Sequence, residues 1–228
     1  MICKPSCLAA LGAVALALAC CTGEPVERAR SDGASVDPAL RRLLDEADTA
    51  VAAGRLADAG LKLDMARGLA PDSPDLWAAI ARLRLRGGEH LTASAAADRA
   101  LALAPDHAPA LLLRAMMVRD SHGLTSALPW IEAALKADPD SADAWAEYAA
   151  TLGDRGDATA MLEAVRRLAG VDPTDRRVPY LQAVIAARAG EYTLARSRLD
   201  RSGMAARGVP AAMLLDAVIS LEEGNPDR

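Results

Sequence analysis

The stretch Pro74–His107 reads PDLWAAIARLRLRGGEHLTASAAADRALALAPDH and decides the fold of this chain. Apolar residues follow helical spacing on both sides of Gly87-Gly88, which predicts two amphipathic helices joined by a tight turn. Laid over the rest of the sequence, the same pattern recurs with a fixed step, equal to the spacing between Ala47 and Ala81. A constant period of this size is the signature of stacked repeats.

Three columns of residues keep this step. The alanine column consists of Ala47, Ala81, Ala115, Ala149, Ala183 and Ala217. The glycine column, seven positions later, consists of Gly54, Gly88, Gly156, Gly190 and Gly224, with His122 in place of glycine in one copy. The proline column consists of Pro71, Pro105, Pro139 and Pro173. Alanine is abundant in this chain, so the glycine and proline columns are the stronger evidence for repeats.

The composition supports helices and argues against other classes. Hydrophobic residues make up 52% of the chain, with no Phe and only 3% aromatic residues. The interior must therefore be built from Ala and Leu, which suits closely packed helices rather than a β-sandwich or barrel. The net charge of −5 carries no block of like charges, so no nucleic-acid partner is expected.

The unit Pro74–His107, with Trp77, Ala81, Gly88 and the later alanines and proline, resembles the tetratricopeptide repeat. The resemblance implies an all-α, right-handed superhelical solenoid of helix-turn-helix repeats, with about five full repeats and one terminal helix. We place the solenoid at residues 40–228, with repeats at 40–73, 74–107, 108–141, 142–175 and 176–209 and a partial repeat at 210–228.

Several repeats depart from the pattern. Pro129 lies early in the second helix of the third repeat, so we expect that helix to begin late or to bend. In the fourth repeat Met161 and Leu168 replace the small residues of the second helix, which should push it outward. The second helix of the fifth repeat should end early, near Gly203.

The first residues resemble a lipoprotein leader. Lys4 precedes an apolar run from Leu8 to Ala19 that has the length of a signal-peptide core but is too short to span a bilayer. The run ends at Cys20 and Cys21, and this ending resembles the lipobox of bacterial lipoproteins, which makes either cysteine the candidate lipidation site. An ordinary cleaved signal peptide or an uncleaved anchor is the alternative.

The resulting organisation is a lipoprotein signal peptide at 1–20 and a flexible tether at 21–39, which is rich in polar residues, Gly, Pro and Ser. We therefore expect a protein of the bacterial cell envelope, lipid-anchored to a membrane and facing the periplasm. Every cysteine of the chain lies at or before Cys21, so the repeats hold no disulfide and no cysteine metal site.

The last helix, from about Ala211 to Glu223, is unusually apolar. Its polar residues Asp216, Ser220 and Glu223 form one narrow stripe, and the apolar arc is too wide for a single buried face. One interpretation is that this helix caps the end of the solenoid although it leaves apolar side chains exposed. The other is that the solenoid continues, either in a longer chain or across a self-association contact through this helix.

No motif for catalysis is present in the sequence. There is no glycine-rich phosphate loop after a strand, no histidine with a second His or carboxylate at metal-ligand spacing on one helix face, and no nucleophile motif. We therefore expect no enzyme activity, no cofactor and no metal. The histidines His90, His107 and His122 are interpreted as surface or capping residues.

In the family that the repeats resemble, the first helices line an inner groove. Carried over position by position, the candidate peptide-binding residues are Arg82, Leu85, Arg86, Leu112, Met116, Arg119, Tyr180, Val184 and Arg188. Asp143 stands at another such position. We expect the four arginines of this set to meet carboxylates of a bound protein segment. The alternative is that they are solvated side chains whose stems cover alanine-rich surface.

The function expected from these features is that of an envelope-anchored protein–protein interaction scaffold. It would assist assembly or secretion of an envelope complex, because its layout is similar to that of pilus-assembly pilotins and of repeat lipoproteins of exopolysaccharide export. Two alternatives are an adaptor portion of a larger enzyme or secretion component, cut at the C-terminus, and an oligomerising structural spacer.

Overall fold

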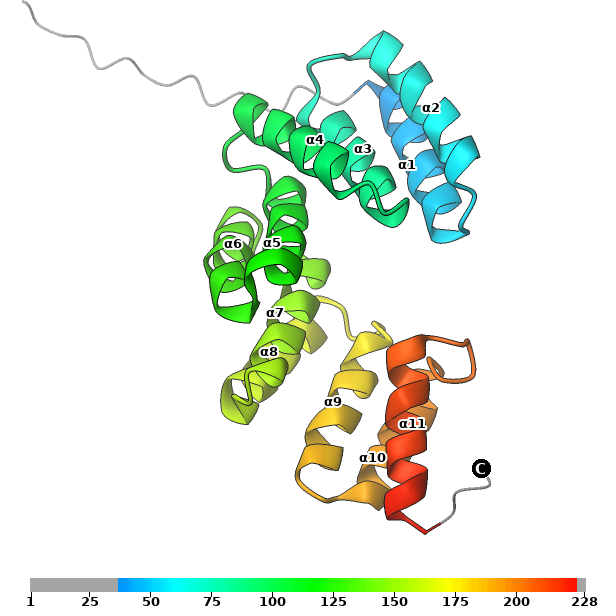
Figure 1. Ribbon diagram of the computed structural model, residues 1–228, viewed down its shortest axis with the longest axis vertical. Helices are drawn as coiled ribbons and strands as arrows, with labels where there is room; N and C mark the ends of the chain where they lie inside the picture. Colours follow the sequence, from blue (N-terminus) through cyan, green and yellow to red (C-terminus); the bar gives the residue numbers. More distant parts are fainter. Residues whose placement is uncertain (1–36, 225–228) are drawn as a thin grey trace, which may run out of the picture. The chain divides into compact units, whose positions relative to one another are not determined.

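The computed structural model describes residues 37–224, and within that range it contains eleven α-helices and no strand (Figure 1). The expected all-α repeat solenoid is confirmed. The helices are α1 (Pro38–Ala52), α2 (Leu56–Leu69), α3 (Pro74–Arg86), α4 (His90–Leu103), α5 (Ala108–His122), α6 (Leu124–Ala137), α7 (Ala142–Asp154), α8 (Ala158–Val171), α9 (Arg177–Arg188), α10 (Tyr192–Ser202) and α11 (Pro210–Glu222). Of these, none has the length and apolar character needed to cross a bilayer.

The helices keep the register of the repeats. The second helices begin at Leu56, His90, Leu124, Ala158 and Tyr192, with the same constant spacing as the alanine column. Each second helix packs on the first helix of its own repeat and on the first helix of the next. Helix α1 begins at Pro38, so the last two residues of the predicted tether are already helical. The predicted signal peptide lies outside the described residues.

The columns of small residues form the buried contact between the two helices of each repeat. Alanines of the first helices are buried at Ala47, Ala81, Ala115, Ala149 and Ala183. Facing them in the second helices are Ala59, Ala93, Ala127, Met161 and Ala195, also buried. Ala217 of α11 is exposed instead, because within residues 37–224 no second helix of the same repeat follows α11. Small side chains let the helix axes approach closely.

The third repeat compensates for the missing glycine by moving its turn one residue along. Helix α5 continues through His122, and Gly123 takes the positive φ of 84° that the glycine column supplies elsewhere. Helix α6 then begins at Leu124, on the register of the other repeats. The expected late start caused by Pro129 is therefore wrong: the proline lies inside α6, on an exposed position of its first half.

The fourth repeat keeps its two helices together by exchanging a large and a small residue. Met161 of α8 is buried where other repeats have alanine, and Leu168 is buried about two turns later. Gly153 of α7 makes room, because a Cβ built on it would lie 2.7 Å from Met161 Sδ. The larger side chain is thus accommodated over a glycine, rather than by the expected outward displacement alone.

The fifth repeat ends its second helix early, as expected. Helix α10 stops at Ser202, and Gly203 follows in the left-handed conformation with a φ of 63°. The buried Ser202 Oγ donates to the carbonyl oxygen of Leu199 at 2.6 Å and accepts from the backbone N–H of Met204 at 3.2 Å. These two hydrogen bonds hold the chain in the turn that leads to α11.

Three first helices begin after a capping side chain; the two serine caps were not predicted, whereas His107 was interpreted as a surface or capping residue. Ser73, Ser141 and His107 each accept a hydrogen bond, at 3.3 Å, from the backbone N–H three residues later. His107 also contacts Asp75 of α3 through Nε2, at 2.9 Å, and this hydrogen bond lowers the pKa of the Asp75 carboxyl. Since Nδ1 accepts from the backbone, the neutral tautomer with hydrogen on Nε2 fits both contacts.

The exchange in the fourth repeat gives a testable coupling. We expect Gly153→Ala to destabilise the wild-type chain by about 1 kcal/mol, because the added methyl group overpacks Met161. In a Met161→Ala background the same substitution should instead stabilise by roughly 0.5 kcal/mol, because only the helix propensity of alanine then remains. Urea unfolding followed by far-ultraviolet circular dichroism measures both differences.

The control is Gly60→Ala in α2, where the nearest atom to an added Cβ is Leu83 Cδ2 at 4.0 Å. Gly60→Ala should stabilise the chain by a similar amount in the wild-type and in the Met161→Ala background, each compared with its own parent. Equal effects of Gly153→Ala with and without Met161 would show that the two positions are not coupled.

Candidate functional site

A groove of about 320 Å³ runs along the first helices of four consecutive repeats. The residues that line it are Arg82, Leu85 and Arg86 of α3, Pro109, Leu112, Leu113 and Met116 of α5, Ser141, Asp143 and Glu147 of α7 and its N-cap, and Arg177 of α9. Helix α3 packs closely against α1 and α5, and α9 against α7 and α11, whereas α5 and α7 make no comparable contact. The groove thus includes the boundary between α5 and α7, where neighbouring first helices are least closely packed.

The floor of the groove is apolar. Leu113 is buried, and Leu85, Leu112 and Met116 are half-buried, so each presents part of its side chain to the groove. The repeat geometry explains this placement, because the residues that face the neighbouring second helix are small and the larger apolar residues fall on the opposite side of each first helix. Such a floor can bury an apolar side chain of a ligand.

The rim of the groove is charged, and most of its charges are paired between repeats. Arg82 of α3 binds Asp48 of α1, with 2.5 Å between Nη1 and Oδ1. Glu147 of α7 pairs with Arg119 of α5. Both pairs join the first helices of adjacent repeats, so they stabilise the stacking of one repeat on the next.

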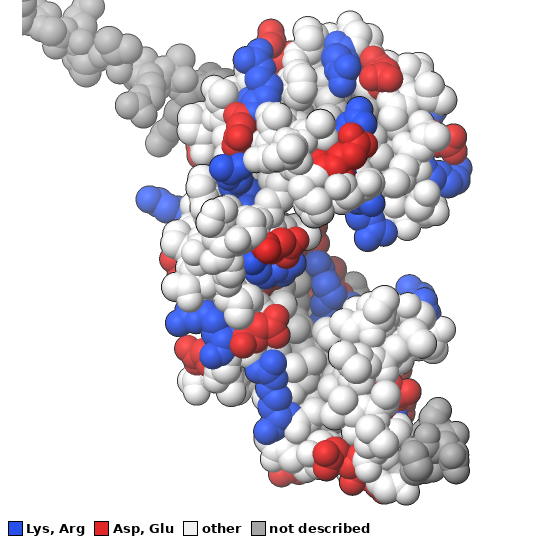
Figure 2. Space-filling model, in the orientation of Figure 1, with Lys and Arg blue, Asp and Glu red and all other residues white. Residues whose placement is uncertain are grey.

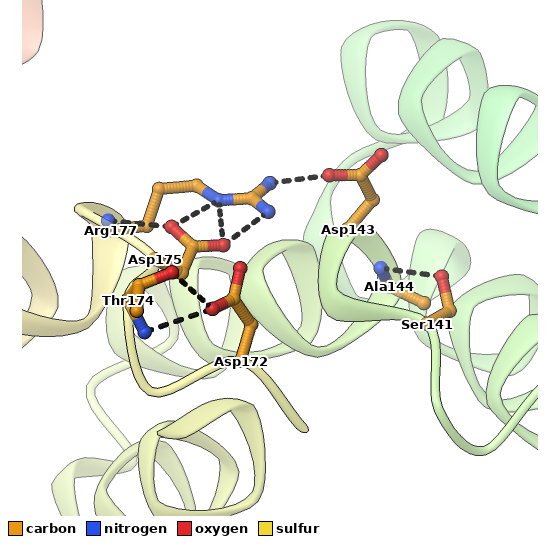
Figure 3. Close-up of polar contacts among 7 residues, drawn as sticks. All are labelled: Ser141, Asp143, Ala144, Asp172, Thr174, Asp175 and Arg177. Carbon is orange, nitrogen blue, oxygen red and sulfur yellow. Dashed lines mark hydrogen bonds and ion pairs between the residues drawn. The ribbon is translucent and has the colours of Figure 1, made fainter. Parts of the chain in front are cut away.

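Arg177 at the start of α9 makes the most extensive of these contacts (Figure 3). Its Nη1 lies 2.7 Å from Asp143 Oδ1, and its Nη2 lies 2.6 Å from Asp175 Oδ2. Burial raises the pKa of the Asp175 carboxyl, but the hydrogen bonds from the Arg177 side chain and backbone outweigh it and leave that pKa below its usual range. Asp175 is therefore ionised and fixes the guanidinium at the groove.

Arg86 differs from the other cations of the groove. It is the last residue of α3, and no described residue forms an ion pair or hydrogen bond with its guanidinium. Its counterpart Arg82, one turn earlier, is held by Asp48. Among the described residues, Arg86 is thus the groove cation that is available to a ligand.

The structure brings part of the predicted site together. Arg82, Leu85, Arg86, Leu112 and Met116 all line the groove. Arg119 lies beside it through its pair with Glu147. Tyr180 and Val184 pack on the hydrophobic core around α7 and α9 instead, and burial raises the pKa of the Tyr180 hydroxyl. Arg188 donates to the backbone oxygen of Gly153 and lies 3.6 Å from Asp154.

These contacts change the interpretation of the arginines. Arg82, Arg119 and Arg188 are engaged by groups of the chain itself, so they are neither free for a ligand nor simply solvated. Five residues that line the groove were not predicted from the sequence: Pro109, Leu113, Ser141, Glu147 and Arg177. A signal for the ion pairs was present: Asp48 and Arg82, Asp143 and Arg177, and Asp154 and Arg188 are each separated by one repeat length.

Other surfaces are less suited to be a binding site that several repeats build together. A larger cavity of about 670 Å³ is confined to α1 and α2 of the first repeat and is lined mainly by charged residues such as Glu46 and Lys62, which pair at 2.6 Å. In the part of the chain that the structure describes, no group of three or more His, Cys, Asp or Glu side chains could hold a metal ion. Figure 2 shows basic and acidic side chains intermixed on the face of the molecule that it presents.

The terminal helix α11 has its polar stripe turned inward. Arg196 of α10, only 8% exposed, donates to Ser220 Oγ at 2.8 Å and to Glu223 Oε2 at 3.1 Å, and it also binds Asp216. The outward face of α11 is consequently apolar. Its exposed large residues are Met213, Leu214, Val218 and Leu221.

Comparisons with known proteins identify the fold. No protein-family model and no curated protein matched the chain. Among solved structures, a thermophilic TPR protein of Thermus thermophilus aligns with a TM-score of 0.64 at 15% identity, covering 81% of this chain and 98% of that one. The pilF protein of Pseudomonas aeruginosa aligns with a TM-score of 0.61 at 18% identity, covering 84% and 87%. A tetratricopeptide repeat protein of Parabacteroides merdae gives 0.55 at 15% identity, covering 82% and 74%. This chain has the tetratricopeptide-repeat fold.

Proposed function

We propose that this protein is an envelope-anchored interaction scaffold whose groove binds a segment of another protein. The observation that carries the proposal is the groove itself, with an apolar floor and a charged rim built by the first helices of four repeats. A volume of about 320 Å³ accommodates a few side chains of a bound segment rather than a folded domain.

The paired charges of the rim support this function in a second way. Because Arg82, Glu147 and Arg177 are fixed by partners from neighbouring repeats, the groove is formed before any ligand arrives. A preformed site loses little conformational entropy on binding, so a short segment can bind with useful affinity. The fold alone does not define a ligand, so the binding chemistry must come from the residues of the groove.

The envelope location rests on the leader, which lies outside the described residues. A lipid on Cys20 or Cys21 would hold the repeats at the membrane, and the predicted tether would separate them from it. In that setting the scaffold would assist assembly or secretion of an envelope complex such as a pilus or an exopolysaccharide system.

The groove is tested by placing a charge in its floor. We expect Met116→Lys to abolish recovery of the partner in an affinity pull-down from cross-linked envelopes, because a lysine there would leave a charge in an apolar site. The matched control is Leu91→Lys on α4, which introduces the same charge at a leucine that is 88% exposed and outside the groove. Quantitative mass spectrometry compares both variants with wild type.

Circular dichroism must show that both variants are folded. A partner recovered by wild type and Leu91→Lys, but not by Met116→Lys, is then confirmed with a synthetic peptide of its bound segment in a titration calorimeter. Equal recovery by all three proteins would exclude the groove as the binding site.

The anchor is tested by metabolic labelling with a fatty acid. We expect labelled lipid in the wild-type protein and its loss in one of the single variants Cys20→Ser and Cys21→Ser, since only the first residue of a processed lipoprotein is acylated. The other variant serves as the control. Labelling of neither the wild type nor either variant would contradict the anchor.

Self-association through α11 is a second candidate role, and the exposed apolar face of that helix favours it. Apolar faces of this kind are seldom left in water when a partner surface is available. A helix of this length buries only a small area, so a pairing of two α11 faces would be weak and concentration-dependent.

We expect wild type to associate at high micromolar concentration in sedimentation velocity, and Leu214→Glu to remain monomeric, because Leu214 is 68% exposed at the centre of the face. Leu91→Glu provides a control at an exposed apolar position elsewhere. A wild-type chain that stays monomeric throughout would rule out this role.

A further inference from the structure

The two sides of the groove have opposite net charges. One side is formed by α3, and we call it the α3 bank; the other is formed by α7 and the start of α9, and we call it the α7–α9 bank. On the α3 bank, Arg82 and Arg86 are opposed by one carboxylate, that of Asp48. The α7–α9 bank has three carboxylates, those of Asp143, Glu147 and Asp175. They are paired with only two guanidinium groups: Arg177 binds Asp143 and Asp175, and Arg119 of α5 binds Glu147. The lining residues and their direct partners therefore leave one unbalanced positive charge on one bank and one unbalanced negative charge on the other.

The unbalanced charges are accessible to a ligand. No described residue binds the guanidinium of Arg86 at the end of α3. The Asp143 side chain is 72% exposed, and only its Oδ1 is engaged, by Arg177. Its Oδ2 therefore remains open to a second cation. Figure 3 shows Asp143 on the far side of the Arg177 guanidinium from Asp175.

The apolar floor lies among the same lining residues. Leu112, Leu113 and Met116 of α5 line the groove together with Arg86 of α3 and Asp143 of α7. Because α5 lies between α3 and α7 in the order of first helices, the floor is flanked by a cation from one neighbour and an anion from the other.

We infer that the groove binds a protein segment with an apolar residue between an acidic and a basic residue. The apolar side chain enters the floor, the acidic residue binds Arg86 and the basic residue binds Asp143. This inference rests on the proposed function and adds the chemistry of the bound segment. Since the two charges differ in sign, they also fix the direction in which the segment crosses the repeats.

The expected loss of peptide affinity is modest, because each of the two contacts is an exposed ion pair. Reversing a charge replaces attraction by repulsion, so we expect Arg86→Glu or Asp143→Lys to weaken binding roughly fivefold, and less at high salt. The arginines held in pairs between repeats should not recognise the ligand in this way, because their own carboxylates already occupy them.

The experiment uses the full chain and a random peptide library displayed on phage. Parallel selections are made on wild type, Arg86→Glu and Asp143→Lys. Wild type should enrich peptides in which acidic and basic residues flank an apolar one. Selection on Arg86→Glu should lose the acidic enrichment alone, and selection on Asp143→Lys the basic enrichment alone.

Matched controls exist for both substitutions. Arg201→Glu on α10 reverses an exposed arginine, and Asp106→Lys before α5 reverses an exposed aspartate; neither lines the groove. Both controls should select the same peptides as wild type. Fluorescence anisotropy then measures one selected peptide and its charge-swapped versions, and a basic residue in place of the acidic one should restore binding to Arg86→Glu.

The outcomes separate this inference from the proposed function. Peptides that bind wild type and fail on Met116→Lys, but show no charge pattern and no rescue, overturn the inference and leave the groove as a binding site. Peptides that bind Met116→Lys as well as wild type, or a selection that enriches nothing, overturn both.

Discussion

The close approach of the two helices within each repeat is the constraint on which the remaining structure depends. Alanine faces alanine across this contact in four repeats, for example Ala81 and Ala93. In the fourth repeat Met161 stands where the other repeats have the second alanine, and Gly153, one turn after Ala149, makes room for it. The larger side chain of Met161 on α8 is thus matched by the missing side chain of Gly153 on α7. The total side-chain volume between the two helices is kept, and a packed interior tolerates this better than a change in its total volume.

Stacking of the repeats adds a second set of contacts, which are electrostatic. Arg82, Arg119 and Arg177 each join a first helix to the next through a carboxylate. These pairs use the side chains that would otherwise be free in the groove. They convert a row of arginines into a fixed rim, and they leave Arg86 and the outer oxygen of Asp143 as the groups that can select a ligand.

The C-terminal end shows how one buried charge sets the orientation of a helix. Arg196 is nearly inaccessible to water, and removal of its carboxylate partners would leave an uncompensated buried cation. Helix α11 therefore turns Asp216, Ser220 and Glu223 towards α10. Its apolar residues, Leu214 among them, face outward as a result. The narrow polar stripe that the sequence shows on this helix is an internal contact in the structure.

The repeat, its register and the all-α architecture could be predicted from the amino-acid sequence, because the constant step places small residues, turn glycines and prolines at fixed positions of successive units. The resemblance to the tetratricopeptide repeat, carried over position by position, also implied that Arg82, Leu85, Arg86, Leu112 and Met116 lie on the groove side, and these residues do line the groove. Which arginines are already paired, and which face of α11 points outward, became apparent from the packed helices alone. Those outcomes depend on distances between side chains of different repeats, and no local pattern or period specifies such distances.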